Sequence, residues 1–238
     1  MNTRLLLICL SLPVFVAQVG AQEVEYKMEL GGGLGGCFYL GDANSKPFAN
    51  LGGMFSLLAR YRFNPRMVIK GNLAMGHIHG TGEGTFFPQD AYSGTVEGGQ
   101  KGAVDFSRNV FDVGAQFEFN FWGYGTGKDY RETKRITPYM LIGMGLTFAP
   151  KPLETAVGFN IPVGVGVKYK LRPRLNIGLE WSIRFTTTDN LDVSNAEGVK
   201  LNDPYGITSS GFKNKDCYSY TMVYLTYDLF PKYRKCNN

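Results

Sequence analysis

The stretch Leu-Asn-Ile-Gly-Leu-Glu-Trp-Ser-Ile-Arg-Phe, residues 175–185, alternates between two kinds of side chain. Its odd positions are all apolar, whereas its even positions hold Asn176, Gly178, Glu180, Ser182 and Arg184. A period of two is typical of a β-strand, because successive side chains of a strand point to opposite faces. The stretch therefore predicts a strand with one apolar face and one polar face.

Other parts of the chain extend this pattern. Similar segments occupy residues 26–39, 51–63, 66–79, 110–121, 135–148, 159–169 and 215–230. No segment has a convincing helical period and no second domain is evident, so we predict eight strands in one domain. Glycine accounts for 31 of the 238 residues and aromatic residues for 14%, and the glycines have no period of three. This composition favours β structure and excludes collagen and disorder.

The N-terminus has the features of a secretory signal peptide. Arg4 precedes an apolar run over residues 5–16, and Val19-Gly20-Ala21 offers a cleavage site of small residues. We expect residues 1–21 to be removed and residues 22–238 to form one exported barrel with a short C-terminal tail. The net charge of +5 gives no indication of nucleic-acid binding.

The predicted connections differ in length between the two ends of the sheet. Asn64-Pro65-Arg66 and Arg172-Pro173-Arg174 are tight turns, whereas residues 79–104 and 188–214 are long loops. In a meander the loops after odd strands share one end and the tight turns share the other. Short turns opposite long loops are typical of outer-membrane barrels. We therefore predict an all-β fold, an eight-stranded antiparallel up-and-down transmembrane β-barrel.

Alternation alone leaves open where the apolar face points. A soluble lipocalin-type barrel turns it inward around a ligand, whereas a membrane barrel turns it outward into lipid. Charges of both signs on the polar face favour the outward orientation, with an interior ion-pair network of Lys27, Glu29, Arg60, Arg62, Glu180 and Arg184. The aromatic residues expected at the ends of the apolar face are Phe63, Phe121, Tyr169, Phe185, Tyr218 and Phe230. Because side chains fill an eight-stranded interior, we predict a plugged barrel.

Three motifs along this pattern carry a family resemblance. The first strand ends Phe38-Tyr39-Leu40-Gly41-Asp42, and the second ends Arg60-Tyr61-Arg62-Phe63-Asn64-Pro65-Arg66. The seventh strand contains Gly178-Leu179-Glu180-Trp181 and Arg184, and it runs into the last long loop as Thr188-Asp189-Asn190-Leu191-Asp192-Val193-Ser194. In order and spacing these motifs resemble the small outer-membrane barrels that include the PorG-like component of the type IX secretion system. The residues assigned to the family motif are Gly41, Asp42, Asp189 and Asp192.

The resemblance implies a non-enzymatic barrel that anchors or organises a periplasmic secretion assembly. Its expected partners are outer-membrane lipid, a periplasmic ring lipoprotein and the partner protein of that lipoprotein. The alternatives are a stand-alone outer-membrane barrel of the adhesion or integrity type and a soluble ligand-binding barrel. No cofactor, metal or catalytic site is expected, because His77 and His79 have neither a third metal ligand nor a recognisable Ser or Asp motif nearby.

The cysteines of the exported chain raise two further expectations. Cys37 and Cys217 lie near the loop ends of the first and last predicted strands, which pair when a barrel closes. A register that places them opposite each other predicts a disulfide across the closure seam. Cys236 follows the last strand in a basic tail with Lys232, Arg234 and Lys235. Given the resemblance, we expect this tail to bind a periplasmic partner, with Cys236 in a disulfide to the ring lipoprotein.

The segment 122–134 is long for a connection at the tight-turn end and is rich in glycine and basic residues. Two interpretations stay open for it, a docking surface and a solvated hairpin end.

Overall fold

The computed structural model describes residues 25–40, 48, 50–84, 102–126, 133–150, 155–188, 191 and 216–232. The side chains of residues 25, 81–84, 102–106 and 232 are not described. The predicted signal peptide, the motif residues Gly41, Asp42, Asp189 and Asp192, and the tail residues Arg234, Lys235 and Cys236 lie outside the described residues. The barrel is the compact unit Tyr26–Phe230.

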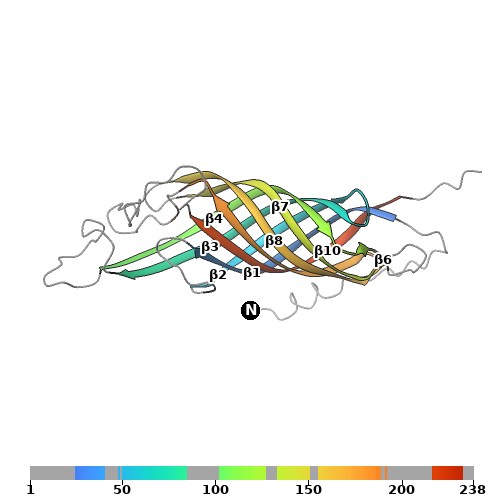
Figure 1. The fold of residues 1–238 in the computed structure, drawn as a ribbon, viewed down its shortest axis with the longest axis horizontal. Coiled ribbons are helices and arrows are strands. Elements are labelled where there is room, and N and C mark those ends of the chain that lie inside the picture. Colours follow the sequence, from blue (N-terminus) through green and yellow to red (C-terminus); the bar gives the residue numbers. More distant parts are fainter. Residues whose placement is uncertain are drawn as a thin grey trace, which may run out of the picture. The chain divides into compact units, whose positions relative to one another are not determined.

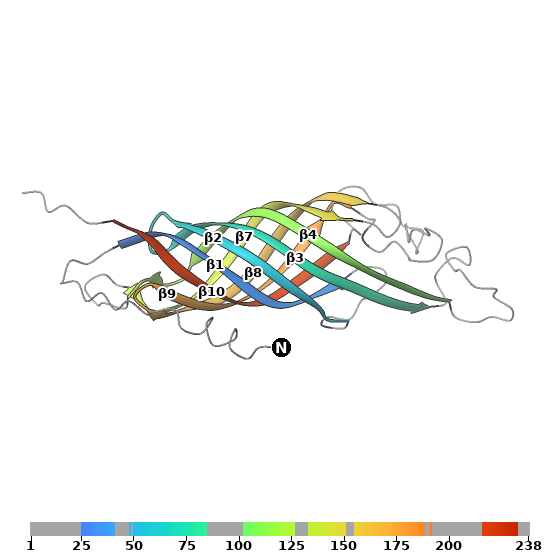
Figure 2. The ribbon, with the colours of Figure 1, turned by 180° about the vertical axis from the view of Figure 1, so that it is seen from behind.

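Eight strands form a closed barrel in which each strand pairs with its neighbours along the chain and β10 lies beside β1 (Figures 1 and 2). They are β1 (Glu25–Leu40), β2 (Gly52–Arg62), β3 (Met67–Gly84), β4 (Gly102–Asn120), β7 (Ile136–Ala149), β8 (Ala156–Arg172), β9 (Leu175–Thr186) and β10 (Cys217–Lys232). The ladders between consecutive strands are antiparallel. The predicted all-β, eight-stranded up-and-down barrel is therefore confirmed. No helix in the described part of the chain is long and apolar enough to cross a membrane.

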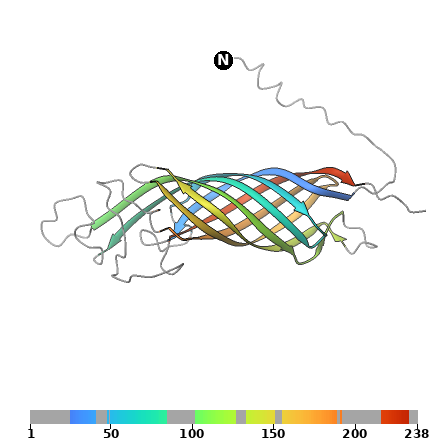
Figure 3. The same cartoon turned by 90° about the horizontal axis from the view of Figure 1, so that it is seen from above.

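Two features of the strands differ from the prediction. The connection between β4 and β7 contains a short parallel ladder of β5 (Gly123–Tyr124) and β6 (Thr133–Lys134), which is too short to give a sequence period. In addition, β3 and β4 stay paired as far as Gly84 and Gly102, whereas the ladder of β3 with β2 ends at Gly76. The β3–β4 hairpin therefore extends past the neighbouring strands at the loop end (Figures 1 and 3).

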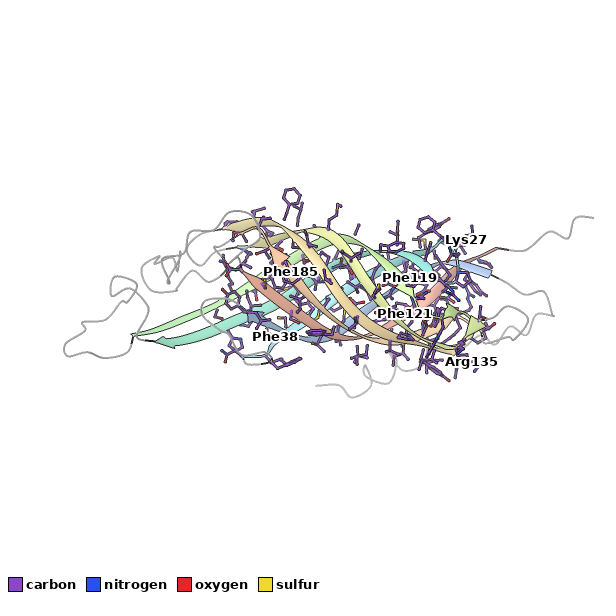
Figure 4. All side chains as sticks on the ribbon, in the orientation of Figure 1. Lys27, Phe38, Phe119, Phe121, Arg135 and Phe185 are labelled. Carbon is purple, nitrogen blue, oxygen red and sulfur yellow. The ribbon has the colours of Figure 1, made fainter. Side chains whose placement is uncertain are left out.

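The apolar face of the strands points outward, as the mixed charges of the polar face predict. On β9, Leu179 is 53% exposed on the outside while Glu180 is 1% exposed on the inside. The same alternation brings large apolar side chains to the outer surface of every barrel strand, among them Leu34, Phe55, Leu73, Phe117, Met144, Val165, Trp181 and Val223 (Figure 4). A monomeric water-soluble protein rarely exposes so extensive an apolar surface.

Five of the six aromatic residues expected at the ends of this face are exposed there, namely Phe63, Phe121, Tyr169, Phe185 and Phe230. Tyr218 is the exception, because it is fully buried inside the barrel and donates a hydrogen bond to Asp112 at 2.8 Å. The even positions of β10 from Tyr218 to Asp228 point inward and carry tyrosines as well as polar residues. With aromatic residues on both faces, the periodicity of this strand did not identify its outer face.

The closure seam has a different register from the expected one. A Cβ atom on Gly31 would lie 2.7 Å from the Cα of Thr226, and one on Gly35 would lie 2.7 Å from the Cα of Met222. Continued along both strands, this register places Cys37 opposite Tyr220 and three residues away from Cys217. A shift by an odd number of residues also exchanges the faces of a strand.

The expected Cys37–Cys217 disulfide is therefore wrong. Cys37 is a free thiol in the barrel interior, and its Sγ donates to the carbonyl oxygen of His77 at 2.9 Å. Cys217 is half-buried and lies opposite Phe185, whose side chain is 40% exposed on the outer face. The two cysteines thus belong to opposite faces of the barrel wall, which no disulfide can bridge without moving a strand.

Candidate functional site: the charged barrel interior

The barrel interior holds most of the described charged side chains. The buried bases are Arg60, Arg62, Lys70, Arg108, Lys168, Lys170 and Arg184. The buried acids are Glu29, Asp112, Glu118, Glu180, Asp216 and Asp228, which are all the acids whose side chains the structure describes. A buried charge is costly unless it is paired, so the partners of each group decide whether this interior is stable.

The middle of the barrel is occupied by two glutamates and three bases. Glu118 accepts from Arg60 Nε at 2.9 Å and from Lys168 Nζ at 3.2 Å. Glu180 accepts from Lys70 Nζ at 2.7 Å at each carboxylate oxygen. Lys70 also lies 3.5 Å from Glu118, which joins the two carboxylates into one cluster. All five side chains are at most 1% exposed, so this cluster leaves no solvated gap at its own level.

The turn end of the interior is closed by Tyr124 of β5. Its hydroxyl donates to Asn176 Oδ1 at 2.8 Å, and its ring is bordered by the cationic groups of Arg62, Lys168 and Lys170 at 5.1–5.5 Å. Burial raises the pKa of Tyr124 above its usual value, which keeps the hydroxyl protonated as a donor. The short ladder of β5 and β6 therefore folds an aromatic side chain into the mouth of the barrel.

Two ion pairs hold the bases around Tyr124. Lys170 Nζ lies 2.6 Å from Asp228 Oδ2, and Asn176 donates to the other oxygen of this carboxylate at 2.8 Å. Arg62 forms a close ion pair with Glu29, whose second oxygen accepts from Thr226 at 3.2 Å. These contacts satisfy both carboxylates on the inside of the barrel.

The loop end of the interior is organised by Asp112. This carboxylate accepts from Arg184 Nε at 3.1 Å, from the hydroxyl of Tyr218 at 2.8 Å and from Asn160 at 2.8 Å. The guanidinium of Arg184 also lies 3.9 Å from the ring centroid of Tyr220. Asp112 and Arg184 thus form a buried pair with polar and aromatic contacts from β8 and β10, and Arg184 also donates to Ser182 Oγ on its own strand at 2.9 Å.

Above this cluster, a loop residue is drawn into the barrel mouth. The backbone nitrogen of Leu191 donates to Asp216 Oδ2 at 2.9 Å, and the Leu191 carbonyl accepts from Arg108 at 3.4 Å. The Leu191 side chain is fully buried. Asp216 also accepts a hydrogen bond from the hydroxyl of Tyr39. Described residues therefore cover the interior at both ends.

Interior glycines make room for tyrosine rings. Tyr139 lies opposite Gly166, and a Cβ on Gly166 would lie 2.4 Å from that ring. Tyr224 lies opposite Gly178 in the same way, and a Cβ on Gly178 would lie 2.3 Å from the Tyr224 ring. The Tyr139 hydroxyl donates to Glu180 at 2.7 Å, so the ring that needs the glycine also belongs to the charged cluster.

Five of the six residues expected in the interior network form ion pairs there, and the structure adds several members that the sequence analysis did not name. Glu29, Arg60, Arg62, Glu180 and Arg184 all form interior ion pairs. Lys27 is half-buried at the start of β1 and forms no ion pair with any described residue. The omitted members are Lys70, Asp112, Glu118, Lys168, Lys170 and Asp228. Strand parity alone would have indicated them, because each lies on the polar face of its strand.

The histidines considered as a metal pair, His77 and His79, lie on β3 in the described part of the chain. No group of three His, Cys, Asp or Glu side chains there could hold a metal ion. His77 Nδ1 and Nε2 instead contact Asn109 Oδ1 at 2.9 Å and Ser107 Oγ at 3.1 Å across the β3–β4 hairpin. His77 is therefore held by hydrogen bonds across this hairpin.

Comparison with known proteins gives one match of family and several of structure. The family DUF6089, described as a domain of unknown function, matches residues 4–238. No curated relative matches the sequence. Neisserial surface protein A is similar with a TM-score of 0.49 and 12% identity, over 85% of this chain and 97% of that one. The attachment invasion locus protein Ail of Yersinia pestis has a TM-score of 0.44 and 14% identity, over 87% and 99%. A major outer membrane protein of Thermus thermophilus has a TM-score of 0.40 and 13% identity, over 86% and 100%.

Proposed function

We propose that this chain, which belongs to the DUF6089 family of unknown function, is a non-enzymatic, plugged β-barrel of the bacterial outer membrane. It reaches that membrane after cleavage of residues 1–21 and anchors or organises a periplasmic secretion assembly of the type IX kind. The observation that carries this proposal is the distribution of side chains between the two faces of the barrel wall. The outer face is apolar, while the inner face holds charges that are paired with one another.

The outer face is suited to the hydrocarbon core of a bilayer. Its apolar side chains are exposed on every strand, and Met144 reaches 72%. Barrel strands of 11 to 19 residues reach or exceed the ~9–11 residues that a tilted strand needs to cross the hydrocarbon region. The soluble ligand-binding alternative requires the opposite arrangement, with an apolar interior, and the charged interior contradicts it.

The filled interior argues against transport of solutes through the barrel. The cluster around Glu118 and Glu180 occupies the middle, and Tyr124 and Leu191 cover the two mouths. A barrel without a path through it acts through the surfaces at its ends. The protein therefore serves as an anchor or an organiser rather than as a channel.

The secretion role is supported by the motif resemblance, part of which now has a structural reason. In Arg60-Tyr61-Arg62-Phe63-Asn64-Pro65-Arg66 the two buried arginines belong to the interior network. Asn64 Oδ1 accepts from the backbone nitrogens of Arg66 and Met67 at 2.8 Å each, which closes the turn. The motif thus combines a plug and a tight turn, two properties that a small anchoring barrel requires.

A second candidate function is a stand-alone barrel of the adhesion or integrity type. The extension of the β3–β4 hairpin past its neighbours at the loop end favours it, because this hairpin presents backbone and side chains beyond the rim. On this alternative the external loops, and not the periplasmic tail, carry the function.

The decisive experiment is affinity purification under non-reducing conditions. A tag inserted between residues 85 and 101 leaves the C-terminal tail untouched, and the native chain is compared with Cys236→Ser and with Cys217→Ser as the matched control. We expect recovery from the outer-membrane fraction together with a periplasmic lipoprotein, in a disulfide-linked band that only Cys236→Ser removes. Recovery from a soluble fraction would contradict the membrane location. Recovery from the membrane without a periplasmic partner would contradict the secretion role and favour the stand-alone barrel.

A further inference from the structure

Outside the interior, the described charged side chains are all positive and lie at the turn end of the barrel. Arg66, Lys134, Arg135 and Arg172 are exposed there, and Lys27 and Arg174 are partly exposed. We call these six residues the basic collar. Every acid with a described side chain is buried in the interior, and none of these carboxylates forms an ion pair with the collar. Asp228, whose backbone carbonyl accepts from Arg174 Nε at 3.2 Å, has its carboxylate paired with Lys170 instead. We propose that the basic collar binds the anionic headgroups of phospholipids in the leaflet at the turn end. This inference rests on the membrane location proposed above.

The collar follows the rim instead of forming a single patch. The β2–β3 turn contributes Arg66, the β4–β7 connection contributes Lys134 and Arg135, and the end of β8 and the turn after it contribute Arg172 and Arg174. Lys27 lies at the start of β1. Figure 4 shows Lys27 and Arg135 at the same end of the barrel, on opposite sides of it. Lipids surround a barrel on all sides, and a ring of bases is suited to such a ligand.

The collar also lies where the apolar outer face ends in aromatic side chains. These are Phe63, Phe121, Trp122, Tyr169 and Phe230, which are 41% to 68% exposed. Rings of this kind lie at the level of the lipid headgroups, where a long basic side chain can rest its stem on a ring and extend its charge to a phosphate. The aromatic residues therefore set the depth at which the bases meet lipid.

Two contacts show this arrangement directly. The ammonium of Lys134 lies 4.4 Å from the ring centroid of Trp122. The guanidinium of Arg174 lies 4.7 Å from the ring of Tyr227 and 5.0 Å from that of Tyr26. The positive groups thus lie beside the rings that border the apolar face, and this flank position favours a lipid over an acidic protein that approaches along the barrel axis.

The strength of the attraction depends on the number of bases that reach the headgroups. One Lys or Arg near an anionic membrane surface contributes roughly a fivefold preference, and the effect weakens as salt is added. Three acids are near the collar in sequence, and the structure describes the side chain of none of them. They are Glu25, Asp129 and Glu132. The test therefore compares charge variants within the complete chain.

The test uses the full chain in vesicles of phosphatidylcholine that contain a minor share of phosphatidylglycerol. Electron paramagnetic resonance measures the association of spin-labelled phosphatidylglycerol relative to spin-labelled phosphatidylcholine. The test variant combines Arg66→Gln, Arg135→Gln and Arg172→Gln. One control has lysine at the same three positions, and a second combines Lys213→Gln and Lys215→Gln, which precede β10 in the sequence and lie outside the collar.

We expect the native chain, the lysine variant and the Lys213/Lys215 variant to prefer phosphatidylglycerol by about fivefold or more. The glutamine variant at the collar is expected to lose most of this preference. No preference in the native chain, or an unchanged preference in the collar variant, would overturn the inference. Inorganic phosphate could also abolish the preference for phosphatidylglycerol while chloride at equal ionic strength does not. That result would identify a free anion as the ligand and would overturn the inference.

Insertion is measured separately, by flotation with the vesicles and by heat-modifiable gel mobility. A chain that fails to insert even into pure phosphatidylcholine contradicts the proposed membrane location. A chain that inserts but has no lipid preference contradicts only the inference on the collar.

Discussion

The ammonium of Lys70 on β3 lies 2.7 Å from each carboxylate oxygen of Glu180 on β9, although 110 residues separate the two in sequence. These strands are not neighbours in the barrel, so the pair forms across the interior. Both side chains are at most 1% exposed. The pair therefore exists only when the barrel is closed, and it ties opposite walls together.

Removal of both partners should cost clearly less unfolding free energy than the sum of the two single removals. In Lys70→Met the Glu180 carboxylate keeps its hydrogen bond from Tyr139 but loses its closest cation, which costs roughly 3 kcal/mol of unfolding free energy. The double variant Lys70→Met/Glu180→Gln should lose clearly less than the sum of the single changes. Urea unfolding of the folded barrel in micelles measures the unfolding free energies of Lys70→Met, Glu180→Gln and the double variant. Additive losses would contradict the pairing.

The tyrosine–glycine contacts predict strong effects of small substitutions. In Gly166→Ala the new methyl group would lie 2.4 Å from the Tyr139 ring, and in Gly178→Ala it would lie 2.3 Å from the Tyr224 ring. Each substitution should destabilise the barrel by about 1–3 kcal/mol through overpacking. Gly53→Ala is the matched control, because a Cβ there meets no atom within 4 Å. Equal unfolding midpoints for Gly53→Ala and Gly166→Ala would contradict this account of the interior.

The filled interior predicts that the native chain is electrically silent in planar bilayers. A quadruple variant, with Arg60, Lys70, Glu118 and Glu180 all changed to Ser, removes four of the five side chains of the central cluster and leaves the net charge of the chain unchanged. We expect this variant to conduct small ions while retaining the gel mobility of a folded barrel.

Either of two results would count against the plug. One is stable conductance by the native chain, and the other is a folded quadruple variant that remains closed.

The seam register predicts the reactivity of the two barrel cysteines. In a Cys236→Ser background, a maleimide should label Cys217 in the folded protein, because Cys217 is half-buried on the outer face. Cys37 is fully buried in the interior and should be labelled only after unfolding. Mass spectrometry of peptides from oxidised protein checks the same point. A peptide pair joined through Cys37 and Cys217 would refute the register.

Much of the fold follows from the sequence because a barrel wall repeats one rule at every position. The segment 175–185 predicts almost the whole of β9, which spans Leu175–Thr186, and identifies Glu180 and Arg184 as interior residues. Alternation is a local property, so it can be read without knowledge of the neighbouring strands. Mixed charge on one face then indicates that this face points away from lipid.

The pairing of strands across the seam and the choice of ion-pair partners were decided only by the tertiary structure. Gly31, Gly33 and Gly35 have no side chains, so the middle of β1 does not reveal its register against β10, and a shift of three residues separated Cys37 from Cys217. Arg62 and Arg66 are the same residue type four positions apart, yet one is buried beside Glu29 and the other is exposed in the turn. Local alternation therefore determines the face of a side chain, whereas its partner depends on how the barrel closes, because closure brings together residues that are distant in sequence.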